Sequence, residues 1–245
     1  MSIMRLAKIC AIVPAAGQGQ RMGGQGNKLL LKLAGTPVLL YVLRTLEQCP
    51  YISDIILPAT EHDIPKIAEI VHQNGISKVR AIVRGGKERQ ESVYLALQAV
   101  DSQTDRIVIH DGARPLLTVQ ELNNFLEQAA FYEAAVMAVK PKDTIKLVDK
   151  EAWAVKTLVR DELCAVQTPQ VFDRVLLEKV HKLAQECQYY TTDDSSLLEW
   201  RGHRVKVLSG SYENIKVTTP EDMLLAELIL RQRSSLSDKG DDVKA

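Results

Sequence analysis

The chain contains 245 residues, of which 46% are hydrophobic and 25% are charged. This length and composition suit one α/β domain with a buried core, and they exclude a disordered polypeptide or a short disulfide-stabilised module. The 31 Lys and Arg residues balance the 31 Asp and Glu residues, and aromatic residues make up only 5% of the chain. Nucleic-acid binding is therefore not expected, because it needs a basic surplus and aromatic surfaces on which bases stack.

The cysteines and the apolar runs indicate where the protein works. The chain has four cysteines and no Cys-x-x-Cys pair, so we expect neither a zinc site nor a disulfide framework, and we expect a reducing, cytoplasmic compartment. The first apolar run, Ile9 to Ala16, ends at a glycine-rich stretch, and no other run approaches the ~18 apolar residues of a membrane-spanning helix. No contact with a membrane is predicted.

Short β-branched runs alternate with longer amphipathic stretches along the first 140 residues. Strands flush with apolar residues are buried on both faces, and a βαβα order predicts a Rossmann-like, mainly parallel sheet sandwiched by helices. The strands are predicted at Ile9–Val13, Ile55–Ala59, Val79–Val83, Arg106–Ile109 and Ala134–Val139, and the helices between them at Pro37–Gln48, Asp63–Asn74, Glu88–Val100 and Thr118–Phe131.

The alternation breaks after Lys140. Two β-like runs between Asp143 and Val159 flank a polar link at Asp149–Ala152, which predicts a protruding hairpin, a β-arm, at about 141–160. Helical spacing and two short strands follow, and a capped final helix begins at Thr219. The later elements are predicted at Leu176–Cys187, Val205–Leu208 and Ile215–Thr218. Residues 1–234 should form one domain, and the polar segment 235–245 should be a flexible tail because it has little to bury.

A glycine-rich loop follows the first strand. It leaves the carboxyl edge of the sheet, where open α/β folds bind their ligands. Its small residues let main-chain N–H groups approach phosphate oxygens, and Arg21 and Lys28 add positive charge. The loop fits neither Gly-x-Gly-x-x-Gly, because Met22 takes the sixth position counted from Gly17, nor the P-loop, because no Gly-Lys-Ser/Thr occurs. A flexible loop with two solvated cations remains the alternative.

The loop belongs to a larger pattern of short motifs. The run Ala15-Ala16-Gly17-x-Gly19-x-Arg21-Met22, followed by Lys28, resembles the nucleotidyltransferases that join a nucleoside triphosphate to a sugar phosphate. Further stretches occur in the order seen in one family, the 2-C-methyl-D-erythritol 4-phosphate cytidylyltransferases. They are Gly85–Val93, His110–Pro115, Lys142–Lys146, Gln167–Gln170 and Asn214–Thr218. The resemblance runs from about Ile9 to Leu230 and implies that 1–234 is a nucleotidyltransferase domain.

The resemblance implies a reaction of CTP with a polyol phosphate in the non-mevalonate isoprenoid pathway, assisted by Mg²⁺. The acceptor phosphate attacks the α-phosphorus and pyrophosphate leaves, so catalysis needs fixed cations and in-line positioning. The family assigns Arg21 and Lys28 to the triphosphate and α-phosphate, and Lys216 to the same centre. A solvated lysine at a strand end is the alternative for Lys216.

Asp111 follows an apolar strand and therefore reaches the carboxyl edge of the sheet. The resemblance gives it contacts to Mg²⁺ and to the CTP ribose, and a hard cation suits a carboxylate together with phosphate oxygens. The alternative is a helix N-cap or a turn, because Asp-Gly is a strong turn signal. His110 is expected to pack within the strand, because no second ligand lies at metal-binding spacing.

The remaining nucleotide contacts come from backbone and small side chains. The family implies CTP-binding roles for Ala15, Ala16, Gly17, Gly86 and Ser92, with Ala15, Gly86 and Ser92 near the cytosine. For Ser92 the alternative is an exposed serine beside a Gly-Gly turn. The sequence departs from the family at Lys87, where some members have Asp, and at Asn27, where Pro is common.

The β-arm carries the predicted contacts to the acceptor. The resemblance implies that Thr144 and Arg160 hold the phosphate of methylerythritol phosphate across a dimer interface, and Arg114 is a secondary candidate. Arginine suits fork-shaped phosphate recognition. An isolated two-stranded hairpin is barely stable in water, so a homodimer through the β-arm is expected.

Two other functions remain open from the sequence. A cytidylyltransferase for ribitol 5-phosphate or another sugar phosphate would share the nucleotide half and differ in the acceptor pocket. A nucleotide-sensing module without chemistry is the second alternative. Its binding task gives no reason to keep Arg21, Lys28, Asp111 and Lys216 together around a reacting phosphate.

Overall fold

The computed structural model describes residues 7–17 and 26–241, and side chains as far as Ser235. Within these residues a central sheet of seven strands has the order β11-β7-β10-β6-β1-β4-β5. Its strands are β1 (Ile9–Ile12), β4 (Ile52–Ala59), β5 (Val79–Arg84), β6 (Arg106–Ile109), β7 (Ala134–Val139), β10 (Ala165–Asp173) and β11 (Lys206–Ser209). The five strands predicted in the first part of the chain are all present, with ends shifted by a few residues at most.

Most neighbours in the sheet are parallel. β1 pairs in parallel with β4 and β6, β4 with β5, and β7 with β11. β10 is the exception, because it runs antiparallel between β6 and β7. The fold is therefore the predicted mainly parallel α/β sheet, with one central strand that the sequence pattern did not indicate.

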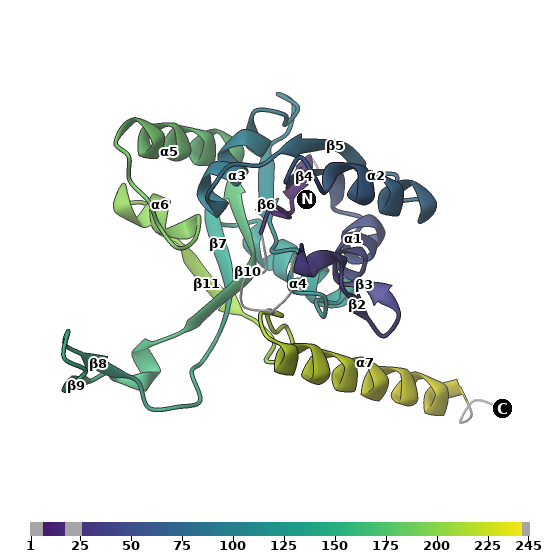
Figure 1. Cartoon of the computed structure of the whole chain (residues 1–245). Helices are drawn as coiled ribbons and strands as arrows, with labels where there is room; N and C mark the ends of the chain where they lie inside the picture. The colour runs from purple at the N-terminus through teal and green to yellow at the C-terminus, as the bar shows by residue number, and fades with distance from the viewer. Residues whose placement is uncertain (1–6, 18–25, 242–245) are drawn as a thin grey trace, which may run out of the picture.

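Helices cover both faces of the sheet (Figure 1). One face packs on α1 (Val38–Gln48), α2 (Ile64–Gln73), α4 (Val119–Ala129) and α7 (Pro220–Asp241), and the other on α3 (Arg89–Leu97), α5 (Arg174–Glu186) and α6 (Ser195–Trp200). Alternate residues of β1 serve the two cores: Ala11 packs with the first group and Ile12 with the second. Burial on both faces explains why this strand is continuously apolar.

The β-arm is present as a separate two-stranded sheet. β8 (Lys146–Val148) pairs antiparallel with β9 (Ala154–Thr157), and a short 3₁₀ helix follows at Arg160–Glu162. The arm projects away from the body of the molecule at the lower left of Figure 1. The side chain of Trp153 is 71% exposed and that of Val155 is 61% exposed. The hairpin therefore presents apolar surface that the described chain does not cover.

One prediction about the last third of the chain was wrong. Residues 215–218 form no strand. They cross the carboxyl edge of the sheet, where the Val217 N–H donates a hydrogen bond to Ala113 O, 2.8 Å away. The final helix runs to Asp241, because extending an existing helix is easier than starting one. It enters the segment expected to be a flexible tail, whose flexibility stays a prediction.

The small elements near the glycine loop complete the description. A 3₁₀ helix spans Lys28–Leu30, and β2 (Lys32–Leu33) pairs with β3 (Thr36–Pro37) just before α1. Across the described parts of the chain, no helix has the length and apolar character needed to cross a membrane.

Candidate active site

The carboxyl ends of β1, β5 and β6 open into one cleft. A hollow of about 1010 Å³ is lined by Ala16, Gly17, Lys28, Gly86 and Lys216, among others. A smaller adjoining hollow of about 180 Å³ shares these five residues and adds Ser92 and Asp111. The larger hollow has room for a nucleotide, since ligand pockets commonly measure ~300–1,000 Å³. Most of the predicted nucleotide residues therefore meet around one space.

Other predicted residues lie elsewhere. Arg21 falls outside the described residues. Ala15 is fully buried behind the cleft, and its N–H donates to Pro58 O over 2.8 Å. Thr144 and Arg160 lie exposed on the β-arm, where Arg160 Nη1 donates to Lys142 O over 3.1 Å. A single chain therefore contains the nucleotide half of the predicted site without the two arm residues.

Asp111 lies at the centre of the charged groups. Its side chain is 10% exposed, and Lys216 Nζ lies 2.7 Å from one carboxylate oxygen while Arg89 Nε lies 3.1 Å from the other. Burial by itself would raise the pKa of Asp111, but the cations Arg89 and Lys216 outweigh it and hold the pKa well below its usual range. Asp111 is therefore an ionised carboxylate at neutral pH.

The sequence left open whether Asp111 is a helix N-cap or a turn residue, and the structure distinguishes the two. The N-cap of the next helix, α4, is Thr118, so Asp111 is no helix cap. Its carbonyl oxygen does accept a hydrogen bond from Arg114 N–H over 3.0 Å, as in a turn. The backbone therefore forms the turn that Asp-Gly predicts, while the side chain is held by cations. A Cβ at Gly112 would lie 2.8 Å from Leu29 Cδ1, so a larger residue there would force the buried Leu29 side chain to shift.

A buried hydrogen-bond chain fixes the backbone beside Asp111. Asp111 N–H donates to Thr168 Oγ1 over 2.9 Å, and this hydroxyl lies 3.1 Å from Nδ1 of His110. His110 Nε2 lies 3.3 Å from the carbonyl oxygen of Arg114, which can only accept. The chain is satisfied when Nε2 carries the proton and Nδ1 accepts from Thr168. His110 is thus a neutral residue that packs in the interior as the sequence predicted, directly after the end of β6.

This arrangement predicts a loss of stability in mild acid. Burial is the main reason why the pKa of His110 is lowered from 6.5 to about 4. The charge of Arg114 lowers the pKa further, whereas the charge of Asp111 partly offsets the decrease. Between these values the unfolded chain binds more protons, so the free energy of unfolding rises with pH up to about 6.5 and falls below it.

From pH 7 to pH 5, His110 should cost the wild type about 2 kcal/mol of unfolding free energy. Urea unfolding of the metal-free protein at both pH values measures it. Because the variant His110→Gln lacks this titration, its free energy of unfolding should fall by about 2 kcal/mol less than that of the wild type between pH 7 and pH 5. An equal loss in both proteins would show that His110 is not buried in its neutral form.

Lys28 and Lys216 approach the cleft from opposite ends of the chain. Lys28 Nζ donates to Val217 O over 2.9 Å, so the segment after the glycine loop contacts the late segment that carries Lys216. The Lys216 side chain is 42% exposed yet ion-paired with Asp111. A simply solvated lysine is thus a poor description of Lys216. The ammonium groups of Lys28 and Lys216 and the carboxylate of Asp111 border the same space.

Asn27 holds the position of Lys28. Its Nδ2 donates to Ala15 O over 2.7 Å and to Asp63 Oδ2 over 3.1 Å, and its Oδ1 accepts from Leu29 N–H over 3.0 Å. Asn27 therefore ties the end of β1, the start of α2 and the 3₁₀ helix together. Proline, which is common at this position in the family, has no side-chain polar atom with which to make these bonds.

Replacing Asn27 by Ala should lower the free energy of unfolding by about 2 kcal/mol, because buried partners are left unsatisfied. Chemical denaturation measures the effect. The matched control is Asn124→Ala, since Asn124 is exposed and its side chain accepts a surface hydrogen bond from Gln120. Equal, small losses in the two variants would contradict the structural role of Asn27.

The other end of the cleft is narrow and built from backbone. A Cβ on Gly85 would lie 2.8 Å from the Ala16 Cβ and 3.0 Å from Ser92 Oγ, so only glycine fits. Ser92 is 2% exposed; its hydroxyl accepts from Gly86 N–H and donates to Glu88 O, both over 3.0 Å. The alternative, a simply exposed serine, is therefore wrong. Ser92 shapes the Gly85-Gly86 turn and keeps one lone pair for a ligand.

A third hollow lies on the far side of Asp111. It measures about 370 Å³ and is lined by Asp111, Arg114, Thr168 and Lys216, among others. Arg114 Nη1 donates to Asn214 O over 2.6 Å, while its buried Nε lacks a hydrogen-bond partner among the described residues. Lys216 therefore borders all three hollows, and Asp111 borders the two smaller ones.

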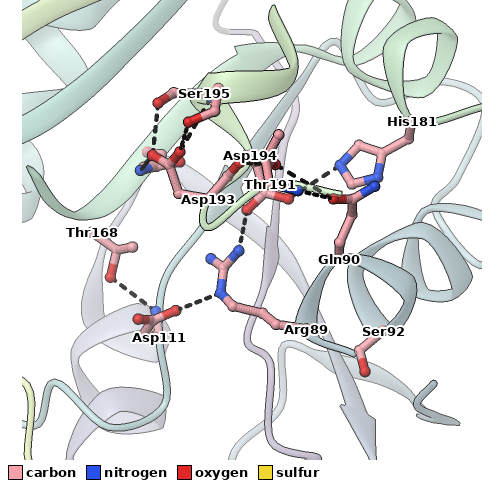
Figure 2. A network of polar contacts seen from close by, with 12 residues as sticks. Arg89, Gln90, Ser92, Asp111, Thr168, His181, Thr191, Asp193, Asp194 and Ser195 are labelled. Atoms are coloured by element: carbon pink, nitrogen blue, oxygen red, sulfur yellow. Dashed lines mark hydrogen bonds and ion pairs between the residues drawn. The ribbon is translucent and has the colours of Figure 1, made fainter. Parts of the chain in front are cut away.

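Two site residues escaped the sequence interpretation. Arg89, which contacts Asp111, lies inside a motif that was noted only for its glycines and serine. The second residue, Asp194, lies in the loop before α6, where neighbouring acids also suit helix capping. Asp194 holds the N-cap position of α6 but makes no side-chain cap bond; Asp193 instead accepts from Ser196 N–H, 3.2 Å away. Figure 2 shows Asp194 turned toward Arg89 and His181.

Comparisons with known proteins agree with this geometry. A family model described as 2-C-methyl-D-erythritol 4-phosphate cytidylyltransferase matches residues 9–232. The chain belongs to this family. The protein of that name from Halalkalibacterium halodurans is 47% identical over 222 residues, which are 91% of this chain and 96% of the relative. The one from Pelotomaculum thermopropionicum is 43% identical over 228 residues, covering 92% and 95%.

Solved structures of cytidylyltransferases share the fold. The crystal structure of 4-diphosphocytidyl-2C-methyl-D-erythritol synthase from Anaerococcus prevotii matches with a TM-score of 0.82 and 32% identity, over 92% of this chain and 99% of that one. The cytidylyltransferase from Thermus thermophilus gives a TM-score of 0.73 at 26% identity, over 91% and 99%. Membership of this nucleotidyltransferase family favours an enzyme over a nucleotide sensor and does not favour the ribitol phosphate alternative.

The cleft of this cytidylyltransferase offers few protein ligands for Mg²⁺. No group of three or more His, Cys, Asp or Glu side chains that could hold a metal occurs among the described residues. Asp111 is one carboxylate at the cleft, beside Glu88, and each Asp111 oxygen keeps a lone pair beside its cation partner. Mg²⁺ commonly uses one or two carboxylates together with substrate phosphates and water. The site thus suits a metal that arrives with the triphosphate.

Proposed function

We propose that the protein transfers the cytidylyl group of CTP to 2-C-methyl-D-erythritol 4-phosphate, giving 4-diphosphocytidyl-2-C-methyl-D-erythritol and pyrophosphate. One observation carries the proposal: in a member of this family, Lys28 and Lys216 border the same cleft as the ionised Asp111. Fixed cations around a phosphorus centre are what phosphoryl transfer needs most, because charge shifts onto phosphate oxygens as bonds change.

In the proposed reaction an oxygen of the acceptor phosphate attacks the α-phosphorus of CTP. The bond from this phosphorus to the oxygen bridging to the β-phosphate breaks, and pyrophosphate leaves with the bond's electron pair. Lys28 and Lys216 stabilise the oxygens of the α-phosphate, and Arg21 contributes to the triphosphate. Asp111, together with triphosphate oxygens, would hold Mg²⁺, and the bound ion would supply charge neutralisation for the leaving group.

The backbone around the cleft is proposed to bind the nucleoside. The Ala16-Gly17 backbone faces the phosphates, while Gly86 and Ser92 contact the cytosine and Ala15 supports them from behind. Lys87 donates its main-chain N–H to Glu91 over 2.7 Å. The departure from Asp at this position therefore leaves the backbone of the turn in place, which supports unchanged base preference.

The acceptor is proposed to occupy the hollow bordered by Arg114 and Thr168, with its phosphate completed by the partner subunit's arm. In a homodimer, Thr144 and Arg160 of one chain would reach the cleft of the other. The exposed apolar residues of the β-arm support this arrangement, since burying them on a partner stabilises an otherwise marginal hairpin. The free thiols of all four cysteines support a reducing, cytoplasmic setting.

A substrate screen tests the proposal. Pyrophosphate release is measured with CTP, ATP, GTP or UTP, with methylerythritol phosphate or ribitol 5-phosphate, in the presence of Mg²⁺ and after its chelation. We expect turnover with CTP and methylerythritol phosphate, and its loss on chelation. Brisk turnover of ribitol 5-phosphate with none of methylerythritol phosphate would overturn the acceptor assignment, and CTP binding without any turnover would overturn the enzyme.

A further inference from the structure

Arg89 joins two acidic groups that lie far apart in the sequence. Its Nε is 3.1 Å from Asp111 Oδ1, and its Nη1 is 2.6 Å from Asp194 Oδ2. Figure 2 shows the guanidinium between the two carboxylates, each facing a different edge of it. A planar fork can donate to both at once, which a lysine ammonium cannot do in the same directions.

Asp194 is anchored from behind. Its side chain is 1% exposed, and its second oxygen lies 3.1 Å from Nε2 of His181, whose side chain is fully buried. The preceding loop is tied to α3 by Gln90, which accepts from Thr191 N–H and donates to Tyr189 O, both over 2.9 Å. Asp194 therefore has little freedom to move, and it fixes the direction of the Arg89 fork.

The arrangement leaves one side of Asp111 available. Arg89 takes Oδ1, whereas Oδ2 faces Lys216, whose side chain is the more exposed partner at 42% against 26% for Arg89. When Lys216 turns to a phosphate, Asp111 still keeps one cation. The four side chains of Asp111, Asp194, Arg89 and Lys216 together carry no net charge in the absence of ligand. The negative charge of the buried Asp194 therefore remains paired with the positive charge of Arg89.

We propose that Arg89 is a positioning residue of the nucleotidyl-transfer reaction: held by Asp194, it orients the Asp111 carboxylate so that the oxygen facing Lys216 is presented to the incoming nucleotide and its metal. The inference rests on the proposed function for the chemistry, yet its main test uses only CTP and Mg²⁺. A buried ion pair contributes little net stability compared with apolar packing. Stability alone therefore does not explain the Arg89–Asp194 pair at the cleft, whereas positioning of Asp111 does.

The first test is Arg89→Lys, with CTP binding measured by calorimetry as a function of Mg²⁺ concentration. Loss of a group that orients a metal-binding carboxylate should raise the half-saturating Mg²⁺ concentration about 10-fold or more and lower kcat about 10- to 100-fold. The matched control is Arg174→Lys. Arg174 is similarly buried, at 19% side-chain exposure, and pairs with Glu178 on α5, away from the cleft.

The outcomes separate positioning from plain structure. Both variants are expected to lower the midpoint of thermal unfolding to a similar extent, while only Arg89→Lys shifts the Mg²⁺ requirement. If Arg89→Lys binds CTP at the wild-type Mg²⁺ concentration and loses only stability, Arg89 is structural and the inference fails. Should that variant not fold, Asp194→Asn carries the same test, because it weakens the anchor without touching Asp111.

A double-variant cycle asks whether Arg89 acts through Asp111. In the Asp111→Asn background, Arg89→Lys should cause no further rise in the half-saturating Mg²⁺ concentration. A full additional rise would mean that Arg89 acts independently, and would overturn the proposal. If the wild type does not turn over methylerythritol phosphate, the proposed function is wrong. The calorimetric measurements of CTP binding would still test whether Arg89 positions Asp111.

Discussion

Lys28→Ala should lower kcat about 100- to 1,000-fold while weakening CTP binding only a few-fold. The ammonium of Lys28 is fixed at the cleft by its hydrogen bond to Val217 O and lies on the rim shared with Asp111. A cation held in that place acts mainly on charge that develops on the α-phosphate as pyrophosphate leaves. The ground-state triphosphate keeps its other contacts, so its affinity changes less than the rate.

Steady-state kinetics and calorimetric CTP binding on the same preparations measure the two effects. Lys32→Ala is the matched control, because Lys32 is an exposed lysine in β2 outside the cleft, and it should leave both values unchanged. Equal losses of kcat and CTP affinity in Lys28→Ala would mean that Lys28 only binds the nucleotide, as in a sensor without chemistry.

The second large effect concerns the β-arm. Arg160→Ala should raise KM for methylerythritol phosphate by about 100-fold, since a charged hydrogen-bonding partner of a phosphate contributes ~1.5–3 kcal/mol. CTP binding should not change, because Arg160 lies outside the nucleotide cleft of its own chain. If the arm reaches into a partner subunit, the defect should also be rescued in trans.

Co-expression of Arg160→Ala chains with Lys28→Ala chains tests this directly. Random pairing gives mixed dimers in which one of the two sites has both an intact Lys28 and an intact partner Arg160, so about a quarter of wild-type activity should return. Lys150→Ala, another exposed arm cation, should need no rescue. Activity no higher than that of the separate variants would contradict an arm that works across the dimer.

The first half of the fold could be predicted because its strands are buried on both faces. Ile107, Val108 and Ile109 are each 0% exposed, and such runs are apolar without alternation. β10 was missed because Gln167–Gln170 interrupts its apolar pattern and proline disfavours a central strand. In the structure the register with β7 shifts between Val166 and Gln170, which accommodates that interruption.

One part of the site, the contact between Arg89 and Asp194, could not be predicted from the sequence for a different reason. Lys28, Asp111 and Lys216 could be chosen because each lies in a short motif that resembles the family's, and Asp111 also comes soon after the apolar strand β6. The Asp194–Arg89 contact joins residues 105 positions apart, through a loop whose acids also suit helix capping. Neither spacing nor composition tells which of Asp193 and Asp194 caps α6 and which turns inward, because that depends on the packing of α3, α5 and α6.

The most direct test of the account is a crystal structure of the protein with CTP and Mg²⁺. The account predicts the α-phosphate within hydrogen-bonding distance of the Lys28 and Lys216 ammonium groups, with Asp111 beside the metal and the cytosine against Gly86. A nucleotide bound elsewhere, or one whose α-phosphate contacts neither lysine, would contradict it.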